Sequence, residues 1–303
     1  MTHLQLNPTL LATLKDKVVV LTGGATGIGR SAIEKFITHG ARVAFGDLND
    51  SAAEALVSKV GSENALYAHC DASSYTDQLG LFAAAEARFG RVDIAVGNAG
   101  IVIPPNPYAA DSDVTQEPPM GEVEVNLKGA IYTSRIAAHY LRKYGGGDVV
   151  LTSSIAGFKE SNGLPIYTAS KHGVVGIVRG ANLDLIRENI RINVVCPWMT
   201  KTAMAKALED GWAKLGLPTN EASDVADSIL ICATANRSPE AGLTHVNTRI
   251  PFAGKILYAS GGKTYEIEDR IQELEPKWLG EENSRVLAKG QEFLAAMPPR
   301  KEV

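Results

Sequence analysis

The sequence predicts a single α/β domain in which helices cover both faces of a doubly wound, parallel sheet of about seven strands. Short apolar runs alternate with longer helical patterns along the 303 residues, as expected when each parallel strand is followed by a crossover helix. A glycine-rich turn, Gly23-Gly24-Ala25-Thr26-Gly27-Ile28-Gly29, separates the first apolar run from the first helical pattern. No change in composition marks a second domain.

The expected elements follow one another in a regular order. Strands are expected at residues 18–21, 42–45, 65–69, 94–97, 149–152, 191–195 and 256–258. Helices are expected at about residues 28–39, 51–60, 78–89, 122–143, 166–188 and 223–235. The first strand, Val18-Val19-Val20-Leu21, is apolar and largely β-branched, as a strand buried on both faces should be.

Three segments lack a regular pattern. Residues 101–119 follow the fourth strand, residues 197–220 follow the sixth, and residues 264–303 form a charged tail. Ligands of open parallel sheets bind beyond the carboxyl ends of the strands, so the first two segments are candidate substrate loops. We expect the tail to pack on the domain or on a neighbouring subunit rather than to take part in catalysis.

Composition and charge exclude several classes of function. Hydrophobic residues make up 45% of the chain, enough for a sizeable core, and the net charge of −4 gives no electrostatic case for nucleic acid. The three cysteines, Cys70, Cys196 and Cys232, are too scattered for a disulfide framework or a metal site, and we expect Cys70 and Cys196 to be plain buried thiols. No secretion signal or membrane-spanning stretch is evident, which predicts a cytoplasmic protein.

The glycine-rich turn has the features of a dinucleotide-binding site. Glycines let the backbone approach a pyrophosphate, and the free amides of the following helix face the anion. Asp47 ends the second strand, where a carboxylate accepts hydrogen bonds from the ribose hydroxyls of adenosine and repels a 2′-phosphate. A turn or helix-capping role for Asp47 remains an alternative. NAD is therefore preferred, although Arg30 could reach a phosphate and leaves room for NADP.

Further candidates follow the third and fourth strands. Asp71 follows the third strand and could meet the adenine edge. Asn98-Ala99-Gly100 ends the fourth strand, where small residues let the chain pass beneath the nicotinamide ribose. Asn98 is as well suited to tying neighbouring strands together as to contacting a ligand.

A proton-transfer site is predicted in the second half of the chain. A free tyrosine has a pKa near 10, and a nearby ammonium group favours its phenolate. Tyr167 and Lys171 stand four residues apart, so one helix face brings them together. Ser154, at the end of the fifth strand, could hold a substrate oxygen in line for proton transfer. Ser153 is adjacent, but the spacing to Tyr167 favours Ser154.

Together these residues resemble the short-chain dehydrogenase/reductase family. The matching motifs are Thr22-Gly-Gly-Ala-Thr-Gly-Ile-Gly29, Asn98-Ala-Gly100, Asn126, Ser154 and Tyr167-Thr-Ala-Ser-Lys171. The resemblance covers roughly residues 15 to 262 and implies a Rossmann domain whose catalytic residues are Asn126, Ser154, Tyr167 and Lys171. In the family pattern Asn126 binds, through its backbone, a water that links Lys171 to solvent.

The resemblance also implies a set of cofactor contacts. These are Gly23, Thr26, Gly27, Ile28, Gly29, Asp47, Leu48, Asp71, Ala72, Asn98, Ala99, Gly100, Tyr167, Lys171, Pro197, Thr200 and Thr202. It divides the chain into a Rossmann-fold catalytic domain at residues 1–262, with a cofactor half at about 15–150 and a substrate half at about 150–262, and a C-terminal extension at 263–303. A homodimer or homotetramer is expected, formed through the helices that hold Asn126 and Tyr167.

Two regions depart from the family pattern. After Pro197 the family has a glycine, but this chain has Trp198, whose bulk could narrow the pocket, stack on a ring or shift the loop. The C-terminal extension runs past the ordinary end, and similar tails occur in fungal members tied to secondary metabolism.

The expected function is that of an NAD(H)-dependent oxidoreductase that interconverts a secondary alcohol and a ketone on a hydrophobic or cyclic small molecule. Tyr167 would act as the acid/base while hydride moves to or from nicotinamide. Alternatives are an NADPH-dependent ketone reductase, a non-redox cyclase or isomerase on the same scaffold, and a cofactor-binding regulator.

Overall fold

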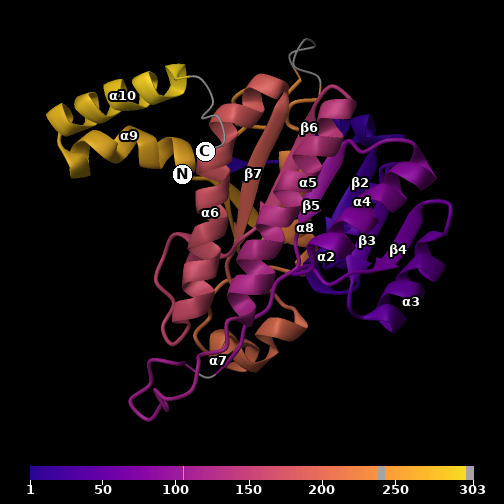
Figure 1. Cartoon of the computed structure of the whole chain (residues 1–303), viewed down its shortest axis with the longest axis horizontal. Helices are drawn as coiled ribbons and strands as arrows, with labels where there is room; N and C mark the ends of the chain where they lie inside the picture. The colour runs from indigo at the N-terminus through magenta and orange to yellow at the C-terminus, as the bar shows by residue number, and fades with distance from the viewer. Residues whose placement is uncertain (105, 238–242, 298–303) are drawn as a thin grey trace.

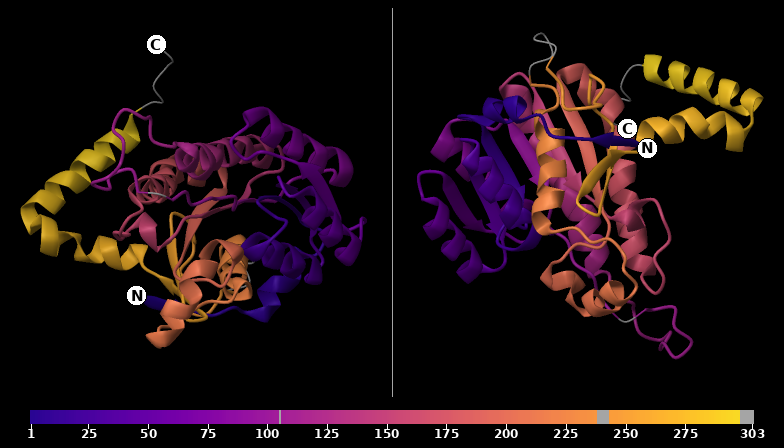
Figure 2. Two further views of the ribbon diagram at one scale, coloured as in Figure 1. Left: turned by 90° about the horizontal axis from the view of Figure 1, so that it is seen from below. Right: turned by 180° about the vertical axis from the view of Figure 1, so that it is seen from behind.

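The computed structural model describes residues 1–104, 106–237 and 243–297. Within these residues a single sheet of nine strands forms the centre of the molecule, and helices cover both of its faces (Figures 1 and 2). The order of the strands across the sheet is β1-β9-β8-β7-β6-β5-β2-β3-β4. The strands are β1 (Thr2–Leu4), β2 (Val18–Thr22), β3 (Arg42–Asp47), β4 (Ala65–His69), β5 (Ile94–Gly97), β6 (Gly147–Thr152), β7 (Ile190–Pro197), β8 (Ile256–Ser260) and β9 (Lys263–Glu266).

The helices alternate with the strands along most of the chain. The α-helices are α1 (Pro8–Leu11), α2 (Gly27–Thr38), α3 (Asp50–Val60), α4 (Tyr75–Phe89), α5 (Gly129–Lys143), α6 (Pro165–Leu185), α7 (Glu209–Lys214), α8 (Ala222–Thr234), α9 (Glu268–Leu279) and α10 (Glu281–Ala296). Shorter helical segments are η1 (Ala12–Leu14), the π-helix η2 (Val123–Lys128), η3 (Ile155–Gly157), η4 (Ile186–Glu188) and η5 (Ala203–Leu208).

The predicted doubly wound fold is confirmed, with seven parallel strands, β2 to β8, at the expected places. Two antiparallel strands were not predicted: β9 pairs with β8, and β1 pairs with β9, Thr2 opposite Glu266. β1 is only three residues long. β9 was not predicted because it carries the charged residues Lys263 and Glu266, which are typical of a charged tail and not of a buried strand.

The core lies on both faces of the sheet because neighbouring residues of a strand point to opposite sides. Val19 and Leu21 of β2 pack in the cluster that includes residues of α2 and α8, whereas Val20 packs in the cluster that includes residues of α4, α5 and α6. β2 and its parallel neighbours are therefore buried on both faces, which explains their continuous apolar sequences.

The sheet places the predicted site at one edge. β2 pairs with β3 on one side and β5 on the other, so the strand order reverses at β2. In open α/β sheets the ligand crevice lies beyond the carboxyl ends of the strands at such a switch point. The carboxyl ends of β2, β3, β5, β6 and β7 all carry residues of the predicted site.

Two of the three segments expected to be irregular contain secondary structure. Residues 197–220 include η5 and α7, and the tail includes α9 and α10, which form the helical hairpin at one side of the molecule in Figure 1. Both tail helices are highly charged on one face, and this charge obscured their helical pattern. Residues 298–303 of the predicted extension and residue 105 of the first loop lie outside the described residues. Among the helices described here, none has the length and apolar character needed to cross a membrane.

Candidate active site

The turn between β2 and α2 has the shape of an anion cradle. Gly23 has a φ of 71°, which a side chain would disfavour, and a Cβ on Gly29 would lie 2.0 Å from the carbonyl oxygen of Gly23. Thr26 precedes the helix without capping it through its side chain. Among the described residues, no side chain accepts a hydrogen bond from the first-turn amides of α2, so these amides are available to donate to a phosphate. The turn therefore fits the pyrophosphate of a dinucleotide.

Asp47 lies at the end of β3, beside this turn. Its carboxylate accepts hydrogen bonds from the backbone amides of Ala25 (2.9 Å) and Asn49 (3.0 Å). These bonds fix the carboxylate against the glycine turn, so the turn-forming role and the predicted ribose-binding role are compatible. Arg30 is paired with Glu34 at 3.1 Å on the exposed side of α2.

Asn98 ties neighbouring strands together, as one of its two predicted roles required. Its Nδ2 donates to the Gly23 carbonyl (2.9 Å), and its Oδ1 accepts from the Thr152 hydroxyl (3.3 Å). Ala99 lies directly against Gly23. Asp71 is held in a local turn, accepting from the backbone amide and hydroxyl of Ser73. The contacts of Asn98 connect the ends of β2, β5 and β6, whereas those of Asp71 are local to the turn after β4.

Tyr167 and Lys171 lie on the first turns of α6, with Lys171 Nζ 5.6 Å from the centre of the Tyr167 ring. Lys171 is only 4% exposed, and its Nζ donates to the carbonyl oxygen of Thr152 at 3.1 Å. A Cβ on Gly100 would lie 3.2 Å from the same Nζ. Lys171 therefore reaches the ends of β5 and β6, where the predicted nicotinamide ribose would bind.

The two neighbouring serines have different environments. Ser153 is buried, and its hydroxyl donates to the backbone carbonyl of Lys171 at 2.8 Å. Ser154 is only partly buried, and its Oγ accepts from the backbone amide of Ala156 at 3.2 Å, which leaves its proton available. Of these two hydroxyls, that of Ser153 is committed to a backbone carbonyl, whereas that of Ser154 can still donate a hydrogen bond.

Asn126 lies in the π-helix η2, where the sequence predicted an uninterrupted α-helix. Its side chain accepts from the amide of Ile101 (2.7 Å), donates to the carbonyl of Ile101 (2.9 Å) and donates to Ser170 Oγ (3.1 Å). π-Helical turns are rare and frequently occur at functional sites. Here the Asn126 side chain joins the segment after β5 to α6. The predicted relay water would therefore bind to the backbone of η2 and not to this side chain.

Burial and neighbouring groups shift the pKa values of Tyr167 and Lys171, and the shift of Tyr167 differs from the one that the sequence predicted. Burial raises the pKa of Tyr167; the Ser154 hydroxyl lowers it, and the negative charge of Glu122 raises it again. Burial lowers the pKa of Lys171 to about 8. The pKa of Tyr167 is therefore raised in the protein alone, not lowered as the sequence predicted, because burial is the largest influence on it.

The segment after β7 closes the other side of the site. Pro197 ends β7, and a Cβ on Gly27 would lie 3.3 Å from the Thr202 methyl group, which brings Thr202 to the glycine turn. Thr200 is buried, and its hydroxyl donates to the Trp198 carbonyl. The Trp198 ring packs on Trp212 of α7, with 5.6 Å between ring centres. The two ring planes are tilted by 56°, so Trp198 packs against an aromatic ring of its own chain without stacking on it.

The remaining predicted contacts lie at the same edge of the sheet. Leu48 is exposed directly after Asp47, and Ala72 is buried with its carbonyl accepting from Gln78. Cys70 and Cys196 are buried thiols, as predicted, and Cys232 is buried as well. Burial raises the pKa of both Cys70 and Cys196 to about 12.

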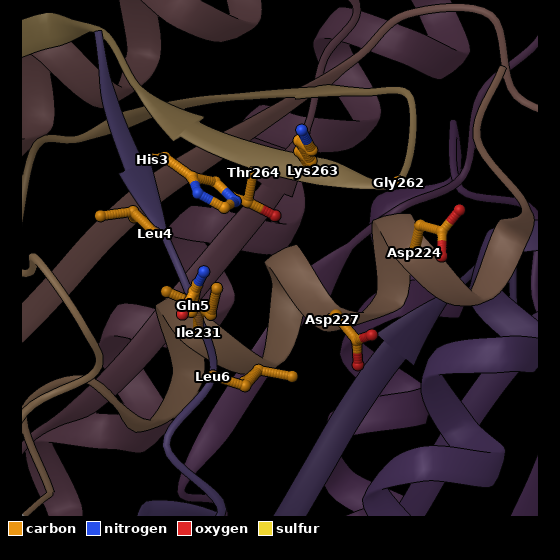
Figure 3. A pocket seen from close by; sticks show the side chains of 10 residues that line it. All are labelled: His3, Leu4, Gln5, Leu6, Asp224, Asp227, Ile231, Gly262, Lys263 and Thr264. Carbon is orange, nitrogen blue, oxygen red and sulfur yellow. The ribbon is translucent and has the colours of Figure 1, made fainter. Parts of the chain in front are cut away.

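A cavity on another part of the surface does not belong to this site. Figure 3 shows it between β1, β9 and α8, lined by residues that include His3, Thr264 and Asp227. None of its lining residues is a predicted catalytic or cofactor-binding residue.

Two residues of the site were not identified from the sequence. Thr152 supplies the carbonyl that holds Lys171 and the hydroxyl that holds Asn98, but nothing in its sequence context distinguishes it from a strand residue. Glu122 is 3% exposed, and its Oε1 accepts from the amide of Ile103 at 2.8 Å. Its position one helical turn before Asn126 was the available signal.

Comparison with known proteins agrees with this geometry. The short chain dehydrogenase family model matches residues 17–212. A short-chain dehydrogenase/reductase of Penicillium roqueforti, prx4, is 34% identical over 302 residues, covering 96% of this chain and 88% of the relative. The trans-4-hydroxycyclohexanecarboxylate dehydrogenase of Sinomonas cyclohexanicum is 32% identical over 232 residues, covering 74% of this chain and 88% of the relative.

Among solved structures, levodione reductase superposes with a TM-score of 0.70 at 24% identity, covering 82% of this chain and 97% of that one, which supports the fold. The family match extends over the glycine turn and over the predicted catalytic residues. The chain therefore belongs to the short-chain dehydrogenase/reductase family of oxidoreductases.

Proposed function

We propose that the protein is an NAD(H)-dependent oxidoreductase that interconverts a secondary alcohol and a ketone on a hydrophobic or cyclic small molecule. The observation that carries the proposal is the grouping of Tyr167, Lys171 and Ser154 at the sheet edge that also holds the glycine turn. A relative at 32% identity bears the name of a dehydrogenase for a cyclohexane alcohol, which supports a cyclic substrate.

The residues of the chain have separate parts in the proposed reaction. The bound nicotinamide would accept hydride from the alcohol carbon, or deliver it to the ketone carbon. Tyr167 takes the hydroxyl proton during oxidation and returns it during reduction. Ser154 donates a hydrogen bond to the substrate oxygen, and Lys171 holds the ribose hydroxyls and favours the phenolate. Asn126 contributes the site of the relay water.

NAD is proposed over NADP because of Asp47. Its carboxylate lies against the glycine turn, where a negative charge disfavours a 2′-phosphate. Arg30, the cation nearest in sequence to the turn, already pairs with Glu34. NADPH-dependent ketone reduction is the alternative that the same site would allow.

The test begins with fluorescence titrations using NADH and NADPH. Wild-type protein should bind NADH more tightly, and Asp47→Ala should reduce that preference. Cyclic secondary alcohols are then screened with NAD⁺ at 340 nm, and Tyr167→Phe should abolish turnover while still binding NADH. A preference for NADPH would refute the role of Asp47. Retained turnover in Tyr167→Phe would refute the mechanism, and substrate consumption without a change at 340 nm would favour a non-redox reaction.

We also propose that the chain is a homodimer or homotetramer and that the extension packs on a neighbouring subunit. α10 is exposed along almost its whole length, and its apolar side chains include Val286, Phe293 and Leu294. α10 contacts α9 but buries none of its own residues, and a 16-residue helix with so little packing is marginal in water. Sedimentation should give a mass above that of one chain, and Phe293→Asp should lower it. A monomeric wild type would refute the assembly, and an unchanged mass in the variant would refute the part assigned to α10.

A further inference from the structure

Glu122 is a buried carboxylate that the proposed reaction leaves without a role. It is 3% exposed, yet it forms no ion pair with any described residue. Two comparably buried carboxylates do have cationic partners: Asp93 pairs with Arg91, and Asp148 pairs with Arg191. Buried charges are normally paired because their desolvation is unfavourable. A buried carboxylate without a cationic partner beside a reactive tyrosine is therefore a candidate functional group.

The first contact of Glu122 is to the start of a candidate substrate loop. Its Oε1 accepts from the amide of Ile103 at 2.8 Å. One helical turn later, Asn126 accepts from the amide of Ile101 at 2.7 Å and donates to the carbonyl of the same residue. The two side chains thus hold alternate residues of the segment after β5, in the way that an edge strand would. This pairing fixes where the loop at residues 101–119 leaves the sheet.

The second effect of Glu122 is electrostatic. The groups that face the Tyr167 side chain are Lys171 of its own helix, Ser154 beside η3, Cys196 of β7 and Glu122 at the start of η2. Burial is the largest influence on Tyr167 and raises its pKa; the charge of Glu122 acts in the same direction. A buried carboxylate therefore influences the same phenol whose ring lies 5.6 Å from Lys171 Nζ.

We propose that Glu122 is a positioning residue of the active site, which tethers the substrate loop through Ile103 and keeps a buried negative charge on the Tyr167 side of the site. The inference rests on the proposed alcohol–ketone chemistry. Its consequence is a pH dependence: alcohol oxidation needs the phenolate, so Glu122 moves the rise in oxidation rate toward higher pH.

The test uses Glu122→Gln, whose amide oxygen still accepts from Ile103 while the charge is lost. The apparent pKa of kcat/KM for alcohol oxidation should fall by about one pH unit, the size expected for a nearby charge in a partly screened site. Glu124→Gln is the matched control, because Glu124 lies on the same π-helix and is paired with Lys128. An unchanged profile in Glu122→Gln, or an equal shift in Glu124→Gln, would overturn the proposal.

A second variant distinguishes the contact of Glu122 with Ile103 from the effect of its charge. Glu122→Ala removes both, so its KM for substrate should exceed that of Glu122→Gln while the two variants share the same shifted pKa. Equal KM values would remove the tether from the proposal.

A measurement without turnover distinguishes this proposal from the proposed function. In protein labelled with ¹³C at tyrosine Cζ, the resonance lost in Tyr167→Phe reports the ionisation of Tyr167. In Glu122→Gln that resonance should titrate at lower pH than in wild type. A wild type that oxidises no secondary alcohol would refute the proposed function, whereas an unshifted resonance would refute the role of Glu122.

Discussion

Replacing Lys171 with methionine should make the protein more stable and inactive. Burial lowers the pKa of Lys171 from 10.5 to about 8, and this shift corresponds to about 3 kcal/mol of folding free energy lost when the amine is protonated in both states. Methionine has a similar length and no charge. It leaves the carbonyl of Thr152 without its donor, which costs about 1 kcal/mol. The expected net gain at pH 7 is therefore about 2 kcal/mol.

The size of this gain in stability depends on pH. The folded-state pKa of Lys171 is depressed, so wild type has its full penalty below about pH 8 and loses it as the pH rises toward 10.5. The gain from Lys171→Met should accordingly shrink to well under about 1 kcal/mol near pH 9.5, where much of the penalty is gone.

The assay is urea denaturation, followed by tryptophan fluorescence, of nucleotide-free protein at pH 7 and near pH 9.5. Lys214→Met, at an exposed position of α7, is the control and should change stability by less than about 0.5 kcal/mol at either pH. A variant that is less stable than wild type at pH 7, or a gain that does not change with pH, would refute the reasoning.

Three further predictions concern the two active-site serines, the glycine turn and the cysteines. Ser154→Ala should lower kcat by about 100-fold or more with little effect on stability. Ser153→Ala should instead destabilise the fold by about 1 kcal/mol with a smaller effect on kcat. Steady-state kinetics and denaturation of both variants test this, and exchanged effects would contradict it. Gly29→Ala should abolish NADH binding, because its Cβ would lie 2.0 Å from the Gly23 carbonyl, and undiminished NADH fluorescence enhancement would show that the turn relaxes freely. Burial raises the thiol pKa values, so the native protein should react with a disulfide reagent at pH 8 far more slowly than the urea-unfolded protein, and rapid labelling of the native form would argue against buried thiols. The cysteines concerned are Cys70, Cys196 and Cys232.

The sequence was most informative where local pattern and burial agree. The parallel strands are apolar because both of their faces are covered, and the glycine turn is needed by backbone geometry, so both could be located within a few residues. The pairing of Tyr167 with Lys171 followed from helical spacing alone. These features depend on short stretches of chain.

The parts that could not be predicted depend on distant contacts. The π-helix at Asn126 contains an extra residue in its turn, and no local sequence signal separates it from an α-helix. Glu122 became recognisable only once its burial and its contact with Ile103 were known. The raised pKa of Tyr167 likewise results mainly from burial by elements far away in the sequence.

The pairing of β1 with β9 has a consequence for the order of folding during synthesis. Thr2, His3 and Leu4 are made long before their partners, Thr264 to Glu266. The loop that this pairing closes is therefore among the longest in the molecule, and its closure entropy is correspondingly unfavourable. The parallel strands from β2 to β7 are complete earlier, so the outer edge of the sheet should be the last part to assemble on the ribosome. Until then, the residues of β1 remain free for chaperones or modifying enzymes that act on nascent chains.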